Sequence, residues 1–301
     1  MTEVERIIDE RILPADFLKE EIRSDFLVDT HRKKIWAIVL DLLIKFDAVC
    51  RKHNLKYFLI GGSLLGVIRH QGFIPWDDDI DVGMLREDYE RFSAIVEKEF
   101  NQPYFWQTPE TDQEYLFSFN KLRNSNTTAI SKPFRYAEFN QGIFLDVFPF
   151  DNGVFEGAEE RHNKINLLNL ENSAHMRRSN PNPTEADLRR LNQFPYRNPK
   201  IVMDEINRIA TQFNNHETSH IQLAVCTIYA YHRLIYQKDL FDQIEFKNFE
   251  GVLEVPVIGG YDEFLRTTYG NYHDLPPVEE RGKWHDSTSF DADLPYWRFQ
   301  Y

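Results

Sequence analysis

The chain has 301 residues, of which 42% are hydrophobic and 14% aromatic, enough to bury a sizeable core in one large domain or two small ones. Its 48 acidic residues outnumber the 35 basic ones and give a net charge of −13, which argues against a nucleic-acid binder with a broad basic surface. The two cysteines, Cys50 and Cys226, cannot build a disulfide framework or a cysteine-ligated zinc site. Any bound phosphate must therefore be met locally, by a metal ion or a few cations.

The N-terminal residues include acids where a signal peptide needs a basic start and an unbroken apolar stretch. The most apolar segment, 35–46, is interrupted by Asp41 and Lys45 and is shorter than the about 20 apolar residues that span a bilayer. We therefore expect a cytoplasmic protein, with any membrane contact peripheral and at the inner face of the plasma membrane. Basic residues between 177 and 200 could face anionic lipid or an anionic glycan acceptor, or be ordinary surface.

In the first part of the chain, predicted helices alternate with short strands. Apolar residues recur with helical spacing over 35–46, and Thr30 is a suitable N-cap before them. A β-favouring run at 57–60 ends in Gly61-Gly62-Ser63, which leads into a helix that ends near His70. Residues 80–82 predict another strand, and a helix follows over about 86–100.

Further along the chain, short β-like pieces at 117–122, 127–130 and 143–148 predict a mixed sheet with helices packed on it. Helical periodicity then runs from 158 to 213, with interruptions at prolines, and indicates a mainly helical second lobe. A last helical stripe over 261–269 is closed by Gly270, which suits the left-handed position after a helix. The pattern as a whole predicts an α+β fold.

The sharpest chemical feature is Trp76-Asp77-Asp78-Asp79-Ile80-Asp81, with four carboxylates within five positions. If Ile80 points into the core from a strand, Asp79 and Asp81 share the opposite face, about 7 Å apart, where they can hold one or two hard cations. Asp146 lies alone in the apolar run 143–148 and needs a partner, for which the metal site is one candidate and an Arg or Lys the other.

Upstream of the acidic run, the Gly61-Gly62-Ser63 turn opens a helix, so its free backbone N–H groups can cradle a phosphate. The same glycines could serve only the tight turn. For the acidic run the alternatives are a solvated loop or a calcium loop of the EF-hand type. The EF-hand template fails, because Val82 stands where it needs glycine and Asp88 where it needs glutamate.

The runs 58–70 (FLIGGSLLGVIRH), 72–84 (GFIPWDDDIDVGM) and 86–89 (REDY) together resemble the LicD family signature. That family includes bacterial phosphocholine transferases and the fukutin-related ribitol-phosphate transferases. The resemblance is close over roughly 57–151, returns more loosely over 261–285, and covers about half of the chain. It implies a nucleotidyltransferase-like mixed β-sheet core with flanking helices. We divide the chain into an N-terminal helical segment (1–55), this catalytic core (56–151), a mainly helical lobe (152–248) and a C-terminal segment that completes the site (249–301).

The resemblance also implies a metal-dependent transferase, with Mg²⁺ or Mn²⁺ and a CDP-alcohol donor, CDP-choline first, whose phosphoalcohol passes to a sugar hydroxyl of a cell-surface glycan or glycolipid such as teichoic acid, lipopolysaccharide or capsule. Asp79, Asp81 and Asp146 are then the catalytic carboxylates and metal ligands, with Asp146 alternatively the general base. The remaining predictions are Gly62, Ser63, Arg69, Lys121 and Arg123 for the donor phosphates, and Trp76, Asp78 and His285 for substrate contact.

Three other functions stay open at this stage. CDP-ribitol or CDP-glycerol could replace CDP-choline, because the residues that set the size of the alcohol pocket cannot be placed from the sequence. A true nucleotidyltransferase uses the same carboxylates but leaves the nucleotide on a small acceptor. A non-catalytic binding protein is disfavoured, since uncompensated carboxylates are costly to keep together.

Overall fold

The computed structural model describes residues 1–194, 197–282 and 288–300, and it confirms the predicted α+β class. The helices of this part of the chain are α1 (Glu3–Asp9), α2 (Thr30–Lys52), α3 (Gly61–His70), α4 (Arg86–Ile95), α5 (Ala158–Met176), α6 (Glu185–Gln193), α7 (Pro199–Thr211) and α8 (Tyr261–Tyr269). The strands are β1 (Glu21–Arg23), β2 (Phe26–Val28), β3 (Phe58–Leu59), β4 (Asp81–Leu85), β5 (Tyr104–Gln107), β6 (Asn120–Asn124), β7 (Thr128–Ser131), β8 (Ile143–Gly153), β9 (His220–Gln222), β10 (Ile235–Gln237), β11 (Ile244–Phe249), β12 (Leu253–Ile258) and β13 (Thr288–Asp291).

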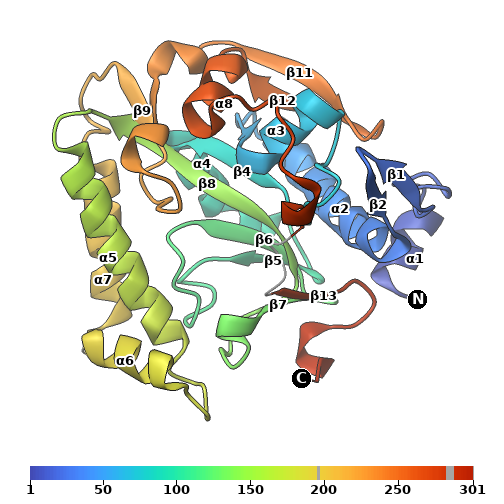
Figure 1. The fold of residues 1–301 in the computed structure, drawn as a ribbon, viewed down its shortest axis with the longest axis horizontal. Helices are drawn as coiled ribbons and strands as arrows, with labels where there is room; N and C mark the ends of the chain where they lie inside the picture. The colour runs from blue at the N-terminus through green and yellow to red at the C-terminus, as the bar shows by residue number, and fades with distance from the viewer. Residues whose placement is uncertain (195–196, 283–287, 301) are drawn as a thin grey trace.

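The main sheet is mixed and is organised around β8, its longest strand (Figure 1). One side of β8 pairs in parallel with β4, which in turn pairs with β3. The first half of β8 also pairs antiparallel with β6, and β6 with β5. The last three residues of β8, 151–153, continue into β9 and β10. A single strand thus carries pairings to several partners along its length, which requires it to be long.

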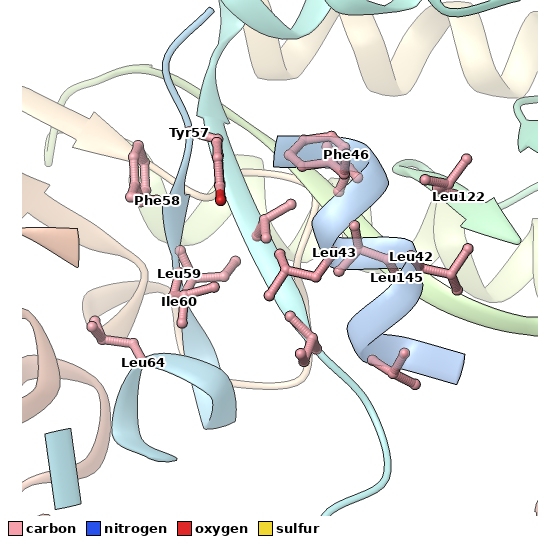
Figure 2. Close-up of a cluster of buried hydrophobic side chains, with 14 of the residues drawn as sticks. Leu42, Leu43, Phe46, Tyr57, Phe58, Leu59, Ile60, Leu64, Leu122 and Leu145 are labelled. Atoms are coloured by element: carbon pink, nitrogen blue, oxygen red, sulfur yellow. The ribbon is translucent and has the colours of Figure 1, made fainter. Parts of the chain in front are cut away.

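Helix α2 supplies one wall of the core. Its N-cap is Asp29, one residue before the predicted Thr30, and the helix continues beyond the predicted stripe to Lys52. The inner side of α2 packs on β6 and β8 of the sheet, with Leu122 and Leu145 beside it (Figure 2). A fully buried leucine or phenylalanine contributes about 1.5–3 kcal/mol, so this face anchors the sheet. The labelled members of the cluster are Leu42, Leu43, Phe46, Tyr57, Phe58, Leu59, Ile60, Leu64, Leu122 and Leu145.

Helices α5, α6 and α7 form the predicted helical lobe, which stands beside the sheet (Figure 1). The sheet itself continues across the boundary that we placed at 151/152, because β9 and β10 of the lobe segment extend it through β8. Strand signals in 220–237 are only three residues long, so their sequence carries no clear period. No helix of the described residues is long and apolar enough to cross a membrane.

Gly83 sits at the crowded centre of β4. A Cβ atom there would lie 2.7 Å from Phe150 Cε2 and 2.7 Å from Phe58 Cε2, closer than packed carbon atoms allow. We expect Gly83→Ala to destabilise the protein by about 1–3 kcal/mol, because both rings must move. Urea unfolding measures the change; a midpoint equal to that of the wild type would mean that the rings around β4 are loosely packed.

Candidate active site

The turn between β3 and α3 is tied to the beginning of β4. The chain passes from β3 into α3 through Gly61, whose φ of +54° lies in the left-handed region that glycine adopts without strain. The Ile60 N–H donates to the Asp81 carbonyl at 3.1 Å, and the Asp81 N–H donates to Ser63 Oγ at 2.8 Å. The first turn of α3 and the first residue of β4 are therefore held as one unit.

The acidic loop before β4 alternates between buried and open side chains. Asp78 and Ile80 are buried, whereas Asp77, Asp79 and Asp81 are half-exposed and line a cleft. This alternation matches the predicted strand pattern, although regular strand pairing begins only at Asp81. The open carboxylates therefore share one side of the segment, as the sequence pattern indicates.

Two side chains from α2 hold this loop in place. Arg32 forms an ion pair with Asp78 and donates to the Asp77 carbonyl at 3.1 Å, and Trp36 Nε1 donates to the same carbonyl at 2.8 Å. Trp36 is fully buried and its ring stacks on Phe73 with centroids 4.5 Å apart. An N-terminal helix outside the predicted catalytic core thus positions the acidic loop.

The cleft has a volume of about 710 Å³ and is closed on its far side by C-terminal parts of the chain. Tyr229 and Tyr269 lie on this wall with their ring centroids 5.9 Å apart. Arg69 of α3 joins the two walls, since its Nη1 donates to the carbonyls of Tyr272 at 2.7 Å and Asp274 at 3.2 Å. Several residues between 269 and 276 line the cleft, and the role of 249–301 in completing an active site stays a prediction.

The carboxylates of the cleft repel one another. Burial raises the pKa of Asp81 well above its ordinary value, and the nearby Asp79, Asp146 and Asp77 raise it further. Asp146 lies opposite Asp81 in the parallel register of β4 and β8, and burial raises its pKa as well. Lys121 opposes both shifts, because it stands opposite Asp146 in β6 and forms an ion pair with it.

The donor set at this place suits a hard divalent cation. A Cβ atom on Gly61 would lie 2.9 Å from Asp81 Oδ2, and one on Gly62 would lie 2.7 Å from Asp77 Oδ2, so carboxylate oxygens stand directly over the glycine backbone. Mg²⁺ commonly takes one or two carboxylates and completes its shell with water and substrate phosphate. The described residues contain no group of three His, Cys, Asp or Glu side chains arranged to hold a metal ion. A cation at this place would therefore have few protein carboxylates as ligands, Asp79 and Asp81 among the candidates, and would need water or substrate phosphate to complete its shell.

The structure brings together five of the predicted site residues along the cleft and leaves others outside its lining. Asp146 and Lys121 lie next to the cleft as an ion pair, although we predicted one for metal and the other for phosphate. Ser63 is buried, and its hydroxyl is used to hold Asp81. His285 lies outside the described residues. The predicted residues that line the cleft are Gly62, Arg69, Trp76, Asp79 and Asp81.

Two predicted roles need correction. Arg123 is buried under the sheet, where its guanidinium bonds Gln107 Oε1 and the Gly142 carbonyl, so it packs the fold and does not line the cleft. Asp78 is committed to Arg32 and is not a lining residue either. Trp76, predicted for substrate contact, lines the cleft, but its ring also has a partner within the protein, since the Arg281 guanidinium stands 4.7 Å from its centroid.

Sequence reasoning missed Tyr229, Tyr269 and Arg32 as parts of the site. Tyr269 belongs to the helical stripe of α8, which was noted only as packing. Tyr229 lies in a loop with no motif. Arg32 is 46 positions before its partner Asp78 in the sequence. Only the folded chain brings these side chains to the cleft.

Comparison with known proteins agrees with the resemblance drawn from the motifs. Residues 54–184 match the family model described as LicD/FKTN/FKRP, nucleotidyltransferase domain. The lipopolysaccharide cholinephosphotransferase LicD of Haemophilus influenzae is 29% identical over 82% of this chain and 93% of its own length. The human ribitol 5-phosphate transferase FKRP is 56% identical over a segment that covers 12% of this chain and 7% of its own. An uncharacterized Rickettsia prowazekii protein is 57% identical over 15% of this chain and 17% of its own.

We expect Asp81→Asn to stabilise the protein when divalent cations are removed, because it deletes one of several repelling carboxylates. Since the folded state raises the pKa of Asp81, the stability of the wild type falls as pH rises from the ordinary carboxyl pKa through the raised one. The gain in Tm should therefore grow with pH and reach about 2–4 °C, or about 1 kcal/mol. Thermal unfolding in EDTA measures it. Asp242→Asn, an exposed position, is the control, and an equal response of the two variants would contradict the repulsion.

We expect Arg32→Ala to cost about 2–3 kcal/mol, because it leaves the carboxylate of Asp78 buried without its cation. The side chains of this pair are only 19% and 7% exposed. Adding Asp78→Asn to the first variant should restore about 1 kcal/mol, since the unpaired charge is gone. A double-mutant cycle by urea unfolding measures both changes. Arg266→Ala, from an ion pair with 55% and 54% exposed side chains, should cost less than about 1 kcal/mol, and equal losses would argue against a clamp.

Proposed function

Because residues 54–184 form a domain of the LicD family, we propose that this chain transfers phosphocholine, or a similar phosphoalcohol, from a CDP-linked donor to a sugar hydroxyl of a cell-surface glycan. The observation that carries the proposal is the half-exposed row of Asp77, Asp79 and Asp81 in a cleft that also has aromatic walls. The similarity of this chain to a lipopolysaccharide cholinephosphotransferase extends over most of both chains. Lipopolysaccharide is therefore the first acceptor to test, with teichoic acid and capsule after it.

The transfer exchanges one phosphorus–oxygen bond for another. An acceptor hydroxyl oxygen bonds to the phosphorus that carries choline, the bond from that phosphorus to the bridging oxygen breaks, and CMP leaves with the bridging oxygen. The hydroxyl proton passes to a carboxylate of the site. Enzymatic phosphoryl transfer depends mostly on positioning and on stabilisation of charge.

The residues of the chain divide these tasks. Asp79 and Asp81 would hold Mg²⁺ or Mn²⁺, which supplies neutralising charge to the donor phosphates. The backbone at Gly62, at the beginning of α3, faces the cleft beside them and is suited to a phosphate oxygen. Asp146 is the candidate to accept the proton, because burial raises its pKa, which makes its carboxylate a stronger base, and Lys121 orients that carboxylate.

A second donor has support from a specific similarity. The segment shared with ribitol 5-phosphate transferases is short but more than half identical. CDP-ribitol is therefore the alternative donor, with CDP-glycerol as its smaller relative. Both keep the carboxylates in the same roles and change only the alcohol.

We expect the full chain with Mg²⁺ to release CMP from CDP-choline and to pass labelled choline phosphate to a lipopolysaccharide extract. Asp79→Ala should lower this rate by about 100-fold or more, because the phosphates lose their metal ligand. Mass spectrometry of the products with CDP-choline, CDP-ribitol, CDP-glycerol and ATP identifies the donor. Asp242→Asn controls for a general effect of removing a carboxylate.

Different products distinguish the alternatives. CMP released only from CDP-ribitol would move the assignment to polyol phosphate transfer. A nucleoside monophosphate found on the acceptor would make the chain a true nucleotidyltransferase. If none of the four nucleotides is consumed in the presence of Mg²⁺ or Mn²⁺, the proposal of an enzyme is wrong.

A further inference from the structure

A second cleft, of about 860 Å³, opens between the core and the helical lobe. It is bordered by α4, by the segment 106–120 that includes parts of β5 and β6, and by α7 (Figure 1). Of the predicted site residues that the structure describes, none lines it. We propose that this second cleft binds the saccharide acceptor of the reaction, as a neutral or amino sugar chain; the inference rests on the proposed function.

The chemistry of the lining suits sugar hydroxyls. Side chains that can both donate and accept hydrogen bonds reach the cleft from all three borders, among them Ser93 of α4, Asn120 of β6 and Asn207 of α7. Aromatic surface accompanies them, since Tyr89, Trp106 and Phe117 also contribute to the lining. A ligand that presents both hydroxyl groups and C–H surface matches this mixture.

The charge of the second cleft excludes an anionic chain. Glu90, Glu97 and Glu110 line it, and no ion pair or side-chain hydrogen bond of the described residues engages their carboxylates. The two cations of the lining are already used: Arg86 bonds both carboxylate oxygens of Asp151 at 2.8 Å, and Lys200 lies 3.6 Å from Asp204. The surplus of negative charge repels phosphate and acidic sugars and tolerates neutral or amino sugars.

A row of neighbouring aromatic rings lies between the two clefts. Phe117 lines the second cleft, its centroid is 5.7 Å from that of Phe119, and Phe119 stacks on Phe148 at 4.2 Å. Phe148 in turn lines the first cleft. The Lys121 ammonium lies 5.9 Å from the Phe117 ring and 5.1 Å from the Phe119 ring. The Lys121–Asp146 pair therefore stands at the partition between the clefts, where an acceptor hydroxyl would meet the donor phosphorus.

The position of the second cleft also suggests a function for the helical lobe. The basic residues there were considered as a surface for anionic lipid or an anionic glycan acceptor, but Arg197 is bound to Glu171 and Lys200 lies near Asp204 within the lobe. The buried apolar face of α7 packs in the core, and its polar residues Lys200, Asp204 and Asn207 contribute to the lining of the second cleft. We therefore infer that the lobe serves acceptor binding.

A glycan array tests the site without requiring catalysis. The labelled full-length protein is applied to immobilised neutral, amino and acidic oligosaccharides at equal density. We expect retention on neutral or amino chains and none on the acidic chains. Asn207→Trp, which fills the cleft from an exposed position on α7, should lower retention at least tenfold, and Arg208→Trp, exposed on the same helix but outside the lining, should leave it unchanged.

A second matched pair tests the charge. Glu90→Gln and Glu87→Gln are neighbours on α4, both exposed, and only Glu90 lines the cleft. Retention of acidic chains should appear with Glu90→Gln and not with Glu87→Gln. The site is refuted if no glycan is retained, if the wild type prefers acidic chains, or if Asn207→Trp binds as the wild type does.

The same variants separate this inference from the proposed function. Hydrolysis of CDP-choline to CMP, with water as the acceptor, needs only the donor cleft. Asn207→Trp should therefore keep the wild-type rate of hydrolysis while losing transfer to glycan. If Asn207→Trp loses glycan retention but neither the wild type nor any variant turns over the donor, the proposed phosphotransferase is refuted and the saccharide site stands. Donor turnover with transfer unaffected by Asn207→Trp would refute the saccharide site alone.

Discussion

The balance of charge where β4 meets β8 governs the architecture of this protein. Asp81 and Asp146 stand opposite each other in parallel register, with two more carboxylates of the acidic loop close by. Lys121 of β6 neutralises Asp146, and Arg32 of α2 neutralises Asp78 in the same loop. A cation bound in the cleft would stabilise this group, since burial alone disfavours the charged carboxylates.

The same helix that completes the core also supports this charged loop. One side of α2 packs on β6 and β8 of the sheet through its leucines and Phe46 (Figure 2). Its first turns carry Arg32 and Trp36, which hold the Asp77 carbonyl. Packing and site geometry are therefore coupled, because a shift of α2 along the sheet moves the acidic loop. The helix precedes the residues matched by the family model, yet it holds the acidic loop of the candidate site.

The chain surrounds its carboxylates with two different environments. The first cleft joins acidic and aromatic surface and is completed by 269–276, which Arg69 fastens to α3. The second cleft is polar and acidic and lies against the helical lobe. The rings of Phe117, Phe119 and Phe148 separate them, with the Lys121–Asp146 pair beside the partition. Two substrates of different chemistry, a charged nucleotide and a sugar, would each find a matching surface.

The sequence by itself determined the α+β class, the helices with a clear period and the family of the 54–184 domain. Helix α8 was predicted with its bounds, including Gly270 after it, because its stripe and its terminator are local signals. The acidic loop was equally predictable, since the alternation of its open and buried side chains follows from consecutive residues of the sequence. Tertiary structure alone decided which partner each charge receives. Lys121 faces Asp146 through strand register, Arg123 faces Gln107, and Tyr229 reaches the cleft from a distant loop, and such long-range pairings leave no periodic trace in the chain.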